Sequence, residues 1–88
     1  MPAACAGLVV PANIQRYVTR ACRLFDAAAD AKPRAERREL RQGVRALHHA
    51  ITAATRAQLK GLAPECAAAL TQRYSDAVER VVVLQSQF

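Results

Sequence analysis

Proline placement is the strongest constraint on how this chain of 88 residues folds. Pro11, Pro33 and Pro64 each precede a stretch with the apolar periodicity of an amphipathic helix. Proline is common in the first turn of a helix, because the N–H that it lacks has no partner there and its fixed φ suits the helix. Gly61 stands just before the last of these prolines, where a helix C-terminus favours glycine. The prolines therefore predict three consecutive helices.

Apolar side chains recur at helical spacing over about residues 13–31, 33–60 and 64–86. Offsets of i, i+3, i+4 and i+7 place such residues on one stripe of a helix. The three stripes are formed by Ile14, Tyr17, Val18, Ala21, Phe25 and Ala28, by Leu40, Val44, Leu47, Ile51 and Ala54, and by Leu70, Tyr74, Ala77, Val81 and Leu84. Because short connections favour antiparallel neighbours, we predict an all-α fold, a three-helix antiparallel bundle.

The bundle is expected to span residues 13–88 and to follow an N-terminal lead-in, residues 1–12. We predict that this lead-in is short and extended and covers one end of the bundle. A short strand at residues 8–10, with the sequence LVV, is the alternative. No Gly/Ser linker, low-complexity tract or internal repeat divides the chain, so a single domain is expected.

Large apolar side chains are scarce for a domain of this size. The hydrophobic fraction is 52%, but alanine supplies much of it, and aromatic residues make up only 5%. A chain this short is near the lower limit at which one core is enough for stability. Burial must then come from closely packed helices or from a second chain, since oligomerisation often compensates for a small core. Both a compact monomer and a homodimer are therefore expected alternatives.

The three cysteines, Cys5, Cys22 and Cys66, are odd in number and widely spaced. Such spacing suggests neither a disulfide framework nor a zinc site, so the sequence predicts reduced thiols in a cytoplasmic protein. Cys22 and Cys66 lie on or beside apolar stripes and are expected in the core. The N-terminus lacks a basic region before its short apolar run, and no later stretch is long enough to cross a bilayer, so no membrane contact is expected.

Charge is strongly biased toward the positive, with a formal net charge of +6 and a pI of about 10.1. The bias is densest in PRAERRELRQGVR, residues 33–45. At about 100° per residue, the cations of the second helix gather opposite its apolar stripe, on a face that holds no acidic residue. These cations are Arg34, Arg38, Arg41, Arg45, Arg56 and Lys60. A polarised face of this kind indicates an acidic partner.

Like charges at i, i+3 and i+4 destabilise a helix by roughly 0.2–0.5 kcal/mol per pair, which makes this arginine row unfavourable in isolation. Two explanations remain open. Either the arginines are simply solvated, with or without contacts to carboxylates of neighbouring helices, or the row is an anion-binding surface. Arg16, Arg20 and Arg23 on the outer face of the first helix would extend such a surface.

The other side chains on this helix face indicate which class of anion the arginines would bind. Rows of guanidinium groups suit phosphate backbones, and release of counterions favours that binding. The face has no aromatic side chain to stack on bases, and only Gln42 is suited to reading them. An acidic protein surface fits the same row, so both an acidic protein and a nucleic acid are expected partners.

A second, apolar surface is predicted from two features. Gly43, Ala46 and Ala50 form a small-residue flank on the second helix, which suits either packing within the bundle or a helix crossing with a partner. The last turns of the third helix carry Val82 and Val83 away from the apolar stripe, with Phe88 at the end. We predict a partner contact there, since exposed apolar patches are often binding sites.

No catalytic, metal-binding or cofactor-binding motif is found. Glycines are isolated, no Ser/His/Asp arrangement is recognisable, and His48 and His49 are adjacent, so a helix points them about 100° apart. We therefore expect no catalytic residues, no metal site and no cofactor. The sequence favours a non-catalytic helical binding protein, a regulator or inhibitor that docks on a larger protein or nucleoprotein machine through the basic helix face and the apolar C-terminal patch. The alternative is a nucleic-acid-binding protein that contacts phosphates through the arginine row.

Overall fold

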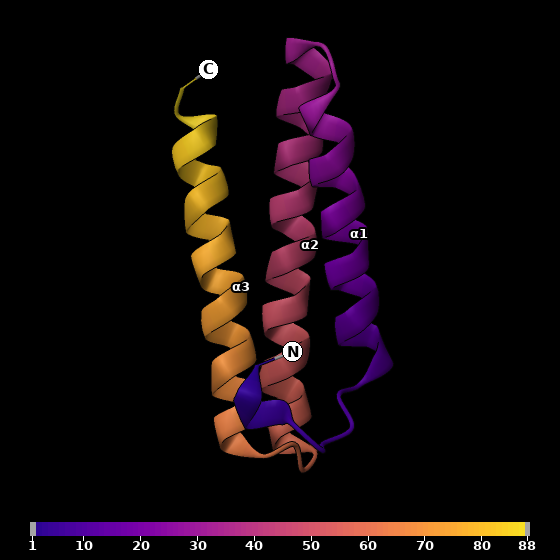
Figure 1. The fold of residues 1–88 in the computed structure, drawn as a ribbon, viewed down its shortest axis with the longest axis vertical. Helices are drawn as coiled ribbons and strands as arrows, with labels where there is room; N and C mark the ends of the chain where they lie inside the picture. Colours follow the sequence, from indigo (N-terminus) through magenta and orange to yellow (C-terminus); the bar gives the residue numbers. More distant parts are fainter. Residues whose placement is uncertain (1, 88) are drawn as a thin grey trace.

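A computed structural model describes residues 2–87, and these residues form helices and no strands. A 3-10 turn, η1 (Ala3–Cys5), is followed by α1 (Ala12–Ala29), α2 (Pro33–Leu59) and α3 (Pro64–Gln85). Consecutive helices run in opposite directions (Figure 1). The predicted all-helical fold with three packed helices is confirmed.

The helix boundaries lie where proline and glycine favour them. Pro33 and Pro64 occupy the first positions of α2 and α3, and Pro11 immediately precedes α1. At the end of α2, Gly61 adopts a φ of +112°, which L side chains rarely tolerate. Its N–H donates to the Gln58 carbonyl at 3.2 Å, while the next N–H, that of residue 62, donates to the carbonyl of residue 57 at 2.9 Å. This pair of bonds is a Schellman motif, which ends α2 and turns the chain into α3.

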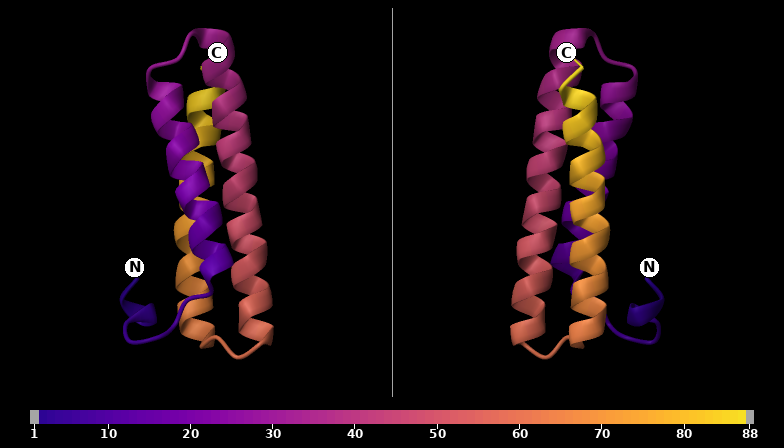
Figure 2. Two further views of the ribbon diagram at one scale, coloured as in Figure 1. Left: turned by 90° about the vertical axis from the view of Figure 1, so that its right-hand side faces the viewer. Right: turned by 90° about the vertical axis from the view of Figure 1, so that its left-hand side faces the viewer.

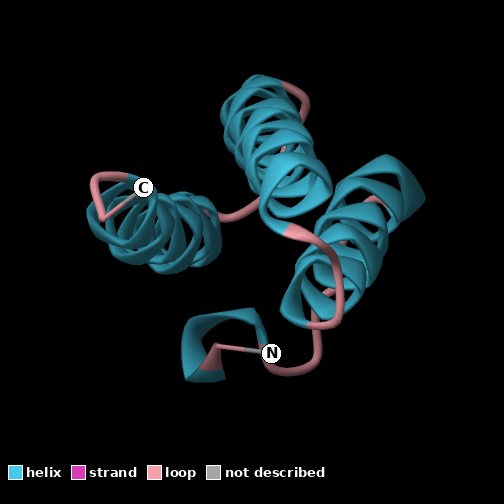
Figure 3. Cartoon of the chain, turned by 90° about the horizontal axis from the view of Figure 1, so that it is seen from above, coloured by secondary structure: helices cyan, strands magenta, loops and turns pink. Residues whose placement is uncertain are grey.

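The three helices form an open arrangement with α2 in the middle. Helix α2 packs against α1 on one side and against α3 on the other, whereas no Cα atoms of α1 and α3 approach within 8 Å in the described chain. Figure 3 shows the N-terminal segment beside the space between α1 and α3. Figure 2 shows that this segment lies near the end of the molecule where α3 begins. It contacts α3 through η1, so only one end of the space is covered.

Alanine dominates the core and brings the helices close together. Ile14, Leu70 and Cys66 are the largest fully buried side chains. The ring of Phe25 lies directly over Gly43, so that a Cβ atom on Gly43 would stand 2.8 Å from the Phe25 Cζ. Glycine at this position lets α1 approach α2 more closely than any other residue would allow.

The small-residue flank of α2 is consequently not a surface. Gly43 is buried, and Ala46 and Ala50 are 3% and 0% exposed. Of the two roles predicted for these residues, the structure places them in packing within the chain. The prediction that they form an apolar interface with a partner is corrected, because α1 and the core already cover them.

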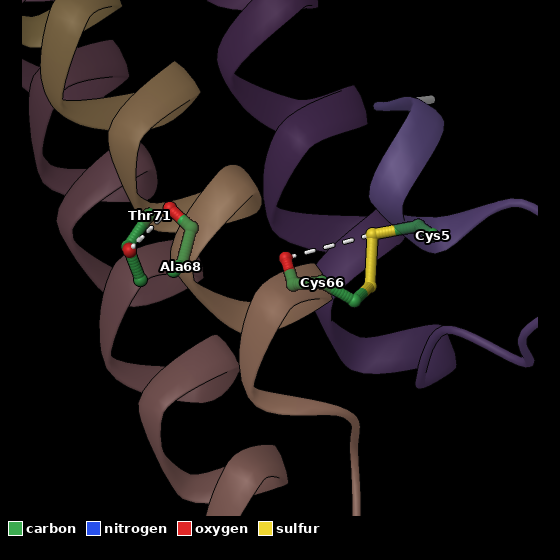
Figure 4. Close-up of a disulfide and its surroundings, with 4 residues drawn as sticks. All are labelled: Cys5, Cys66, Ala68 and Thr71. Atoms are coloured by element: carbon green, nitrogen blue, oxygen red, sulfur yellow. Dashed lines mark hydrogen bonds between the residues drawn. A yellow bond between two sulfur atoms is a disulfide. The ribbon is translucent and has the colours of Figure 1, made fainter.

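A disulfide between Cys5 and Cys66 joins the N-terminal turn to the start of α3 (Figure 4). The two Cα atoms are 4.7 Å apart, and both residues are buried. The Cys5 Sγ also lies 3.5 Å from the Cys66 carbonyl oxygen, a contact that is not a hydrogen bond because a disulfide sulfur carries no hydrogen. The prediction of three reduced thiols is therefore wrong. Cys22 is a free thiol but is exposed, so its predicted place in the core is also corrected.

The cysteine prediction failed because the two partners are separated by 61 positions in the sequence. Their approach depends on the lead-in folding back along α3, which no local pattern indicates. Among the described residues, no helix is both long enough and apolar enough to cross a membrane.

Candidate functional site: a basic face on α1 and α2

The predicted cations of α2 all lie on its exposed side. Within the described residues none of them forms an ion pair with a carboxylate, so the structure supplies no counter-charge to the row. We call the following set the basic face: Arg34, Arg38, Arg41, Arg45 and Arg56 of α2, Lys60 directly after α2, and Arg16, Arg20 and Arg23 of α1. Within the described residues, these cations are therefore exposed to solvent and are not paired with carboxylates of neighbouring helices.

The contribution of α1 to the basic face is a compact group. Arg16, Arg20 and Arg23 are all exposed and border one shallow hollow together with Gln15 and Thr19. Positions four and three apart lie on neighbouring turns, so these guanidinium groups point to the same side of α1. The hollow is lined by no acidic residue.

The two rows of cations meet in a notch between α1 and α2, which we call the Arg20–Arg45 notch. Tyr17 and Arg20 come from α1, and Gln42, Arg45 and His49 come from α2. Ala46 forms the floor between them. The Tyr17 and His49 rings stack with centroids 5.3 Å apart and planes inclined by 24°. The notch has a volume of about 220 Å³.

Sequence reasoning found only part of this notch. Arg20 and Arg45 belong to the predicted basic face, but Tyr17 was assigned to the apolar stripe, and no binding role was predicted for His49. The stripe assignment of Tyr17 is half right, since its ring is half-buried against the core. The one available signal was that Tyr17 is a tyrosine in an apolar stripe. A tyrosine ring commonly lies with its apolar body buried and its hydroxyl in water, so it can also border a surface site.

The acidic residues nearest the arginine row turn away from it. Glu36 and Glu39 are half-buried on the inner side of α2, and neither forms an ion pair with another described residue. The Oε2 atom of Glu39 is buried without a hydrogen-bond partner. These carboxylates therefore do not neutralise the basic face directly.

The predicted apolar C-terminal surface is exposed in part. Val82 and Val83 are 49% and 62% exposed on α3. Phe88 lies outside the described residues. Beside this surface, an apolar groove of about 320 Å³ opens between α1 and α3, at the end that η1 leaves uncovered. The groove is lined by Phe25, Ala28, Ala29, Glu36, Leu40, Val81 and Leu84.

A second exposed apolar group was not predicted. At the opposite end of the molecule, Leu8, Val9 and Leu59 are 43%, 91% and 85% exposed. Leu8 and Val9 also border a shallow hollow with the loop between α2 and α3. Val10, the next residue of the lead-in, is only 8% exposed and belongs to the core.

No protein-family model matches the chain, and comparisons with curated proteins and with solved structures found no match. Within residues 2–87, no group of three or more His, Cys, Asp or Glu side chains is placed to hold a metal ion. The candidate site is therefore the basic face, an exposed surface of cationic side chains, with one recess, the Arg20–Arg45 notch.

Proposed function

We propose that this chain is a small helical binding protein that docks on an acidic protein surface through its basic face. The observation that carries the proposal is that the residues of the basic face are exposed on two adjoining helices and form no ion pair with a described carboxylate. Neighbouring arginines repel one another in the free protein. Carboxylates of a partner that lie between them relieve this repulsion, which stabilises the complex. Such a protein acts as a regulator or inhibitor of its target and performs no catalysis itself.

The exposed end of α3 supplies the apolar part of the contact. Val82 and Val83 offer the desolvated centre that a stable protein interface usually needs, because charged contacts at a rim contribute more to association rate than to affinity. A homodimer through this same surface stays a prediction. Light scattering at tens of micromolar distinguishes the monomer from the dimer.

The disulfide indicates in which cellular compartment the chain works, and the compartment limits which partners it can meet. The cytoplasmic prediction rested on reduced thiols, and the Cys5–Cys66 bond removes that premise. Structural disulfides persist mainly in oxidising compartments and are rare in the cytosol of mesophiles. We infer that the chain works in an oxidising compartment. Chromosomal DNA and most RNA are absent there, which favours an acidic protein as the partner.

Nucleic-acid binding is the second candidate, and the spacing of the arginines favours it. Steps of three and four residues from Arg34 to Arg45 separate successive arginines by about 4.5–6 Å along the axis of α2, so several of them can contact phosphates of one backbone. The Arg20–Arg45 notch also adds a tyrosine ring, which the sequence had not placed on this face.

Affinity purification from the native host, with and without nuclease, separates these candidates. A protein target is expected to stay bound after nuclease treatment and to lose affinity only moderately between about 50 and 200 mM salt, while a complex held by 6–10 phosphate contacts weakens by about 10³–10⁵-fold over that range. Loss of all retained material on nuclease treatment would contradict docking on a protein. A Val82→Asp variant should weaken a protein complex and leave phosphate contacts unchanged.

A further inference from the structure

The Arg20–Arg45 notch has the chemistry of a site for a single tetrahedral oxyanion. We infer that it binds a phosphate monoester group, so that the acidic partner presents a phosphorylated residue at this point of the basic face. This inference rests on the proposed function, since it specifies one contact within the same surface.

Charge is the first support. Arg20 of α1 and Arg45 of α2 both line the notch, so each of two helices contributes an arginine to it. None of the lining residues is acidic, and neither arginine has a carboxylate partner among residues 2–87. Guanidinium groups match phosphate oxygens with parallel, charge-assisted hydrogen bonds, which are roughly twice as strong as neutral ones.

Donor chemistry is the second support. Gln42, Tyr17 and His49 also line the notch, and the amide, hydroxyl and imidazole of these side chains can each donate a hydrogen bond. A tetrahedral dianion has oxygens directed to several sides and accepts from donors on different walls. A planar carboxylate, with its two oxygens in one plane, would use fewer of them.

Shape is the third support. A volume of about 220 Å³ is far above the roughly 10–15 Å³ that a single water needs, and below the roughly 300–1,000 Å³ of pockets that hold whole small molecules. The notch therefore accommodates a charged group with its waters rather than a complete metabolite. The stacked Tyr17 and His49 rings hold one wall in place.

The experiment titrates the full-length, disulfide-bonded protein with inorganic phosphate and with phenyl phosphate, using chloride and acetate as controls. Chemical shifts of the backbone amides and of the arginine side chains report binding. We expect saturable shifts centred on residues 17–20 and 42–49 with both phosphates, and no saturable shifts with acetate. Tighter binding of phenyl phosphate than of inorganic phosphate identifies the monoester as the ligand, and tighter binding of inorganic phosphate would show that free phosphate is the ligand and overturn the phosphorylated partner.

Variants with matched charge changes show whether the notch itself is responsible. Arg20→Gln and Arg45→Gln should each weaken phosphate binding about tenfold, the loss expected for a charge-assisted hydrogen bond. Arg80→Gln removes the same charge from the exposed side of α3 and should change the affinity less than twofold. His49→Phe keeps a ring for Tyr17 to stack on and should weaken binding by removal of the imidazole donor alone.

Two further outcomes overturn the inference: phosphate shifts that never saturate, or equal losses in the Arg45→Gln and Arg80→Gln variants. Circular dichroism confirms that each variant is helical, and Arg45→Lys, which keeps the charge without the paired donors, should still lose affinity. If the notch binds no phosphate but the purified partner still requires the basic face, only this inference fails. If phosphate binds and the partner ignores the basic face, the proposed function fails instead.

Discussion

At the scale of single residues, Gly43 explains how α1 and α2 come together. Its position inside a long helix costs about 1 kcal/mol relative to alanine, and the sequence alone left open whether it packs within the bundle or against a partner. The partner that makes the approach, the ring of Phe25, was not predictable, because it depends on how α1 is rotated about its own axis relative to α2.

Replacing Gly43 with alanine is therefore expected to destabilise the protein despite the better helix propensity of alanine. A Cβ there would lie 2.8 Å from the Phe25 Cζ, and overpacking of this kind costs about 1–3 kcal/mol. We expect a net loss of about 1 kcal/mol in the free energy of unfolding, measured with urea. In a Phe25→Leu background, where the clashing ring atoms are missing, the same substitution should cost less or stabilise. An equal loss in both backgrounds would show that the ring is not the cause.

Tyr74 is expected to make the stability of the fold depend on pH in the alkaline range. Burial raises the pKa of its phenol above the ordinary value of 10.0, and the positive charge of Arg73 opposes this shift without cancelling it. Because the folded state favours the protonated phenol, its contribution to stability is complete below a pH of about 10 and is lost as the pH rises through the folded pKa. The Tyr74→Phe variant should lose less stability than the parent between about pH 9 and pH 11, a window set by the ordinary value of tyrosine. The measurement is the free energy of unfolding as a function of pH, and an identical dependence in the parent and the Tyr74→Phe variant would contradict this role of Tyr74.

At the scale of elements, the sequence was sufficient to predict the helices but not to predict which of their residues are in contact. Proline at a first turn and an apolar stripe are local signals, and they gave α2 and α3 directly. The disulfide and the Arg20–Arg45 notch each join residues from separate elements, so their prediction requires the packing phase of one helix against another. The position of each arginine on its own helix was predictable, whereas the meeting of Arg20 with Arg45 was not.

Removing the disulfide with Cys5→Ser and Cys66→Ser should lower the free energy of unfolding by roughly 4 kcal/mol, the chain-entropy value for partners 61 positions apart. The N-terminal turn would then be held against α3 by non-covalent packing alone. The Cys22→Ser variant is the control: its side chain is exposed, so its stability should change by less than about 0.5 kcal/mol. Thiol titration of the unfolded parent should find a single free thiol, and three would contradict the structure.

The arginine row of α2 is expected to destabilise its own helix. In the Arg41→Glu variant, repulsion with Arg38 and Arg45 is replaced by attraction at i, i+3 and i+4 spacing, and each such pair contributes about 0.2–0.5 kcal/mol. We expect the free energy of unfolding to rise by about 0.5–1 kcal/mol at low salt, with a smaller gain at 1 M salt, where charges are screened beyond about 3 Å. A loss of stability at low salt would indicate that Arg41 has a structural role that the described contacts do not contain.

At the scale of the whole molecule, the chain separates two kinds of surface around an alanine-rich core. The basic face covers the outer sides of α1 and α2, while apolar side chains are exposed at the two ends, on α3 and on the lead-in. Composition predicted the net charge of +6 but not this division, because the open arrangement of α1 and α3 leaves apolar residues uncovered that a closed bundle would bury.

Docking through the basic face is tested most directly by one affinity comparison with the purified partner. The Arg38→Glu and Arg41→Glu double variant reverses the centre of that face, and the Arg73→Glu and Arg80→Glu double variant makes the same charge change on the exposed side of α3. Binding is measured by calorimetry at about 150 mM salt, where distant charges are largely screened. The proposal predicts a loss of more than tenfold for the α2 variant and less than threefold for the α3 variant. Equal affinities for the two variants would show that net charge, and not this surface, determines binding.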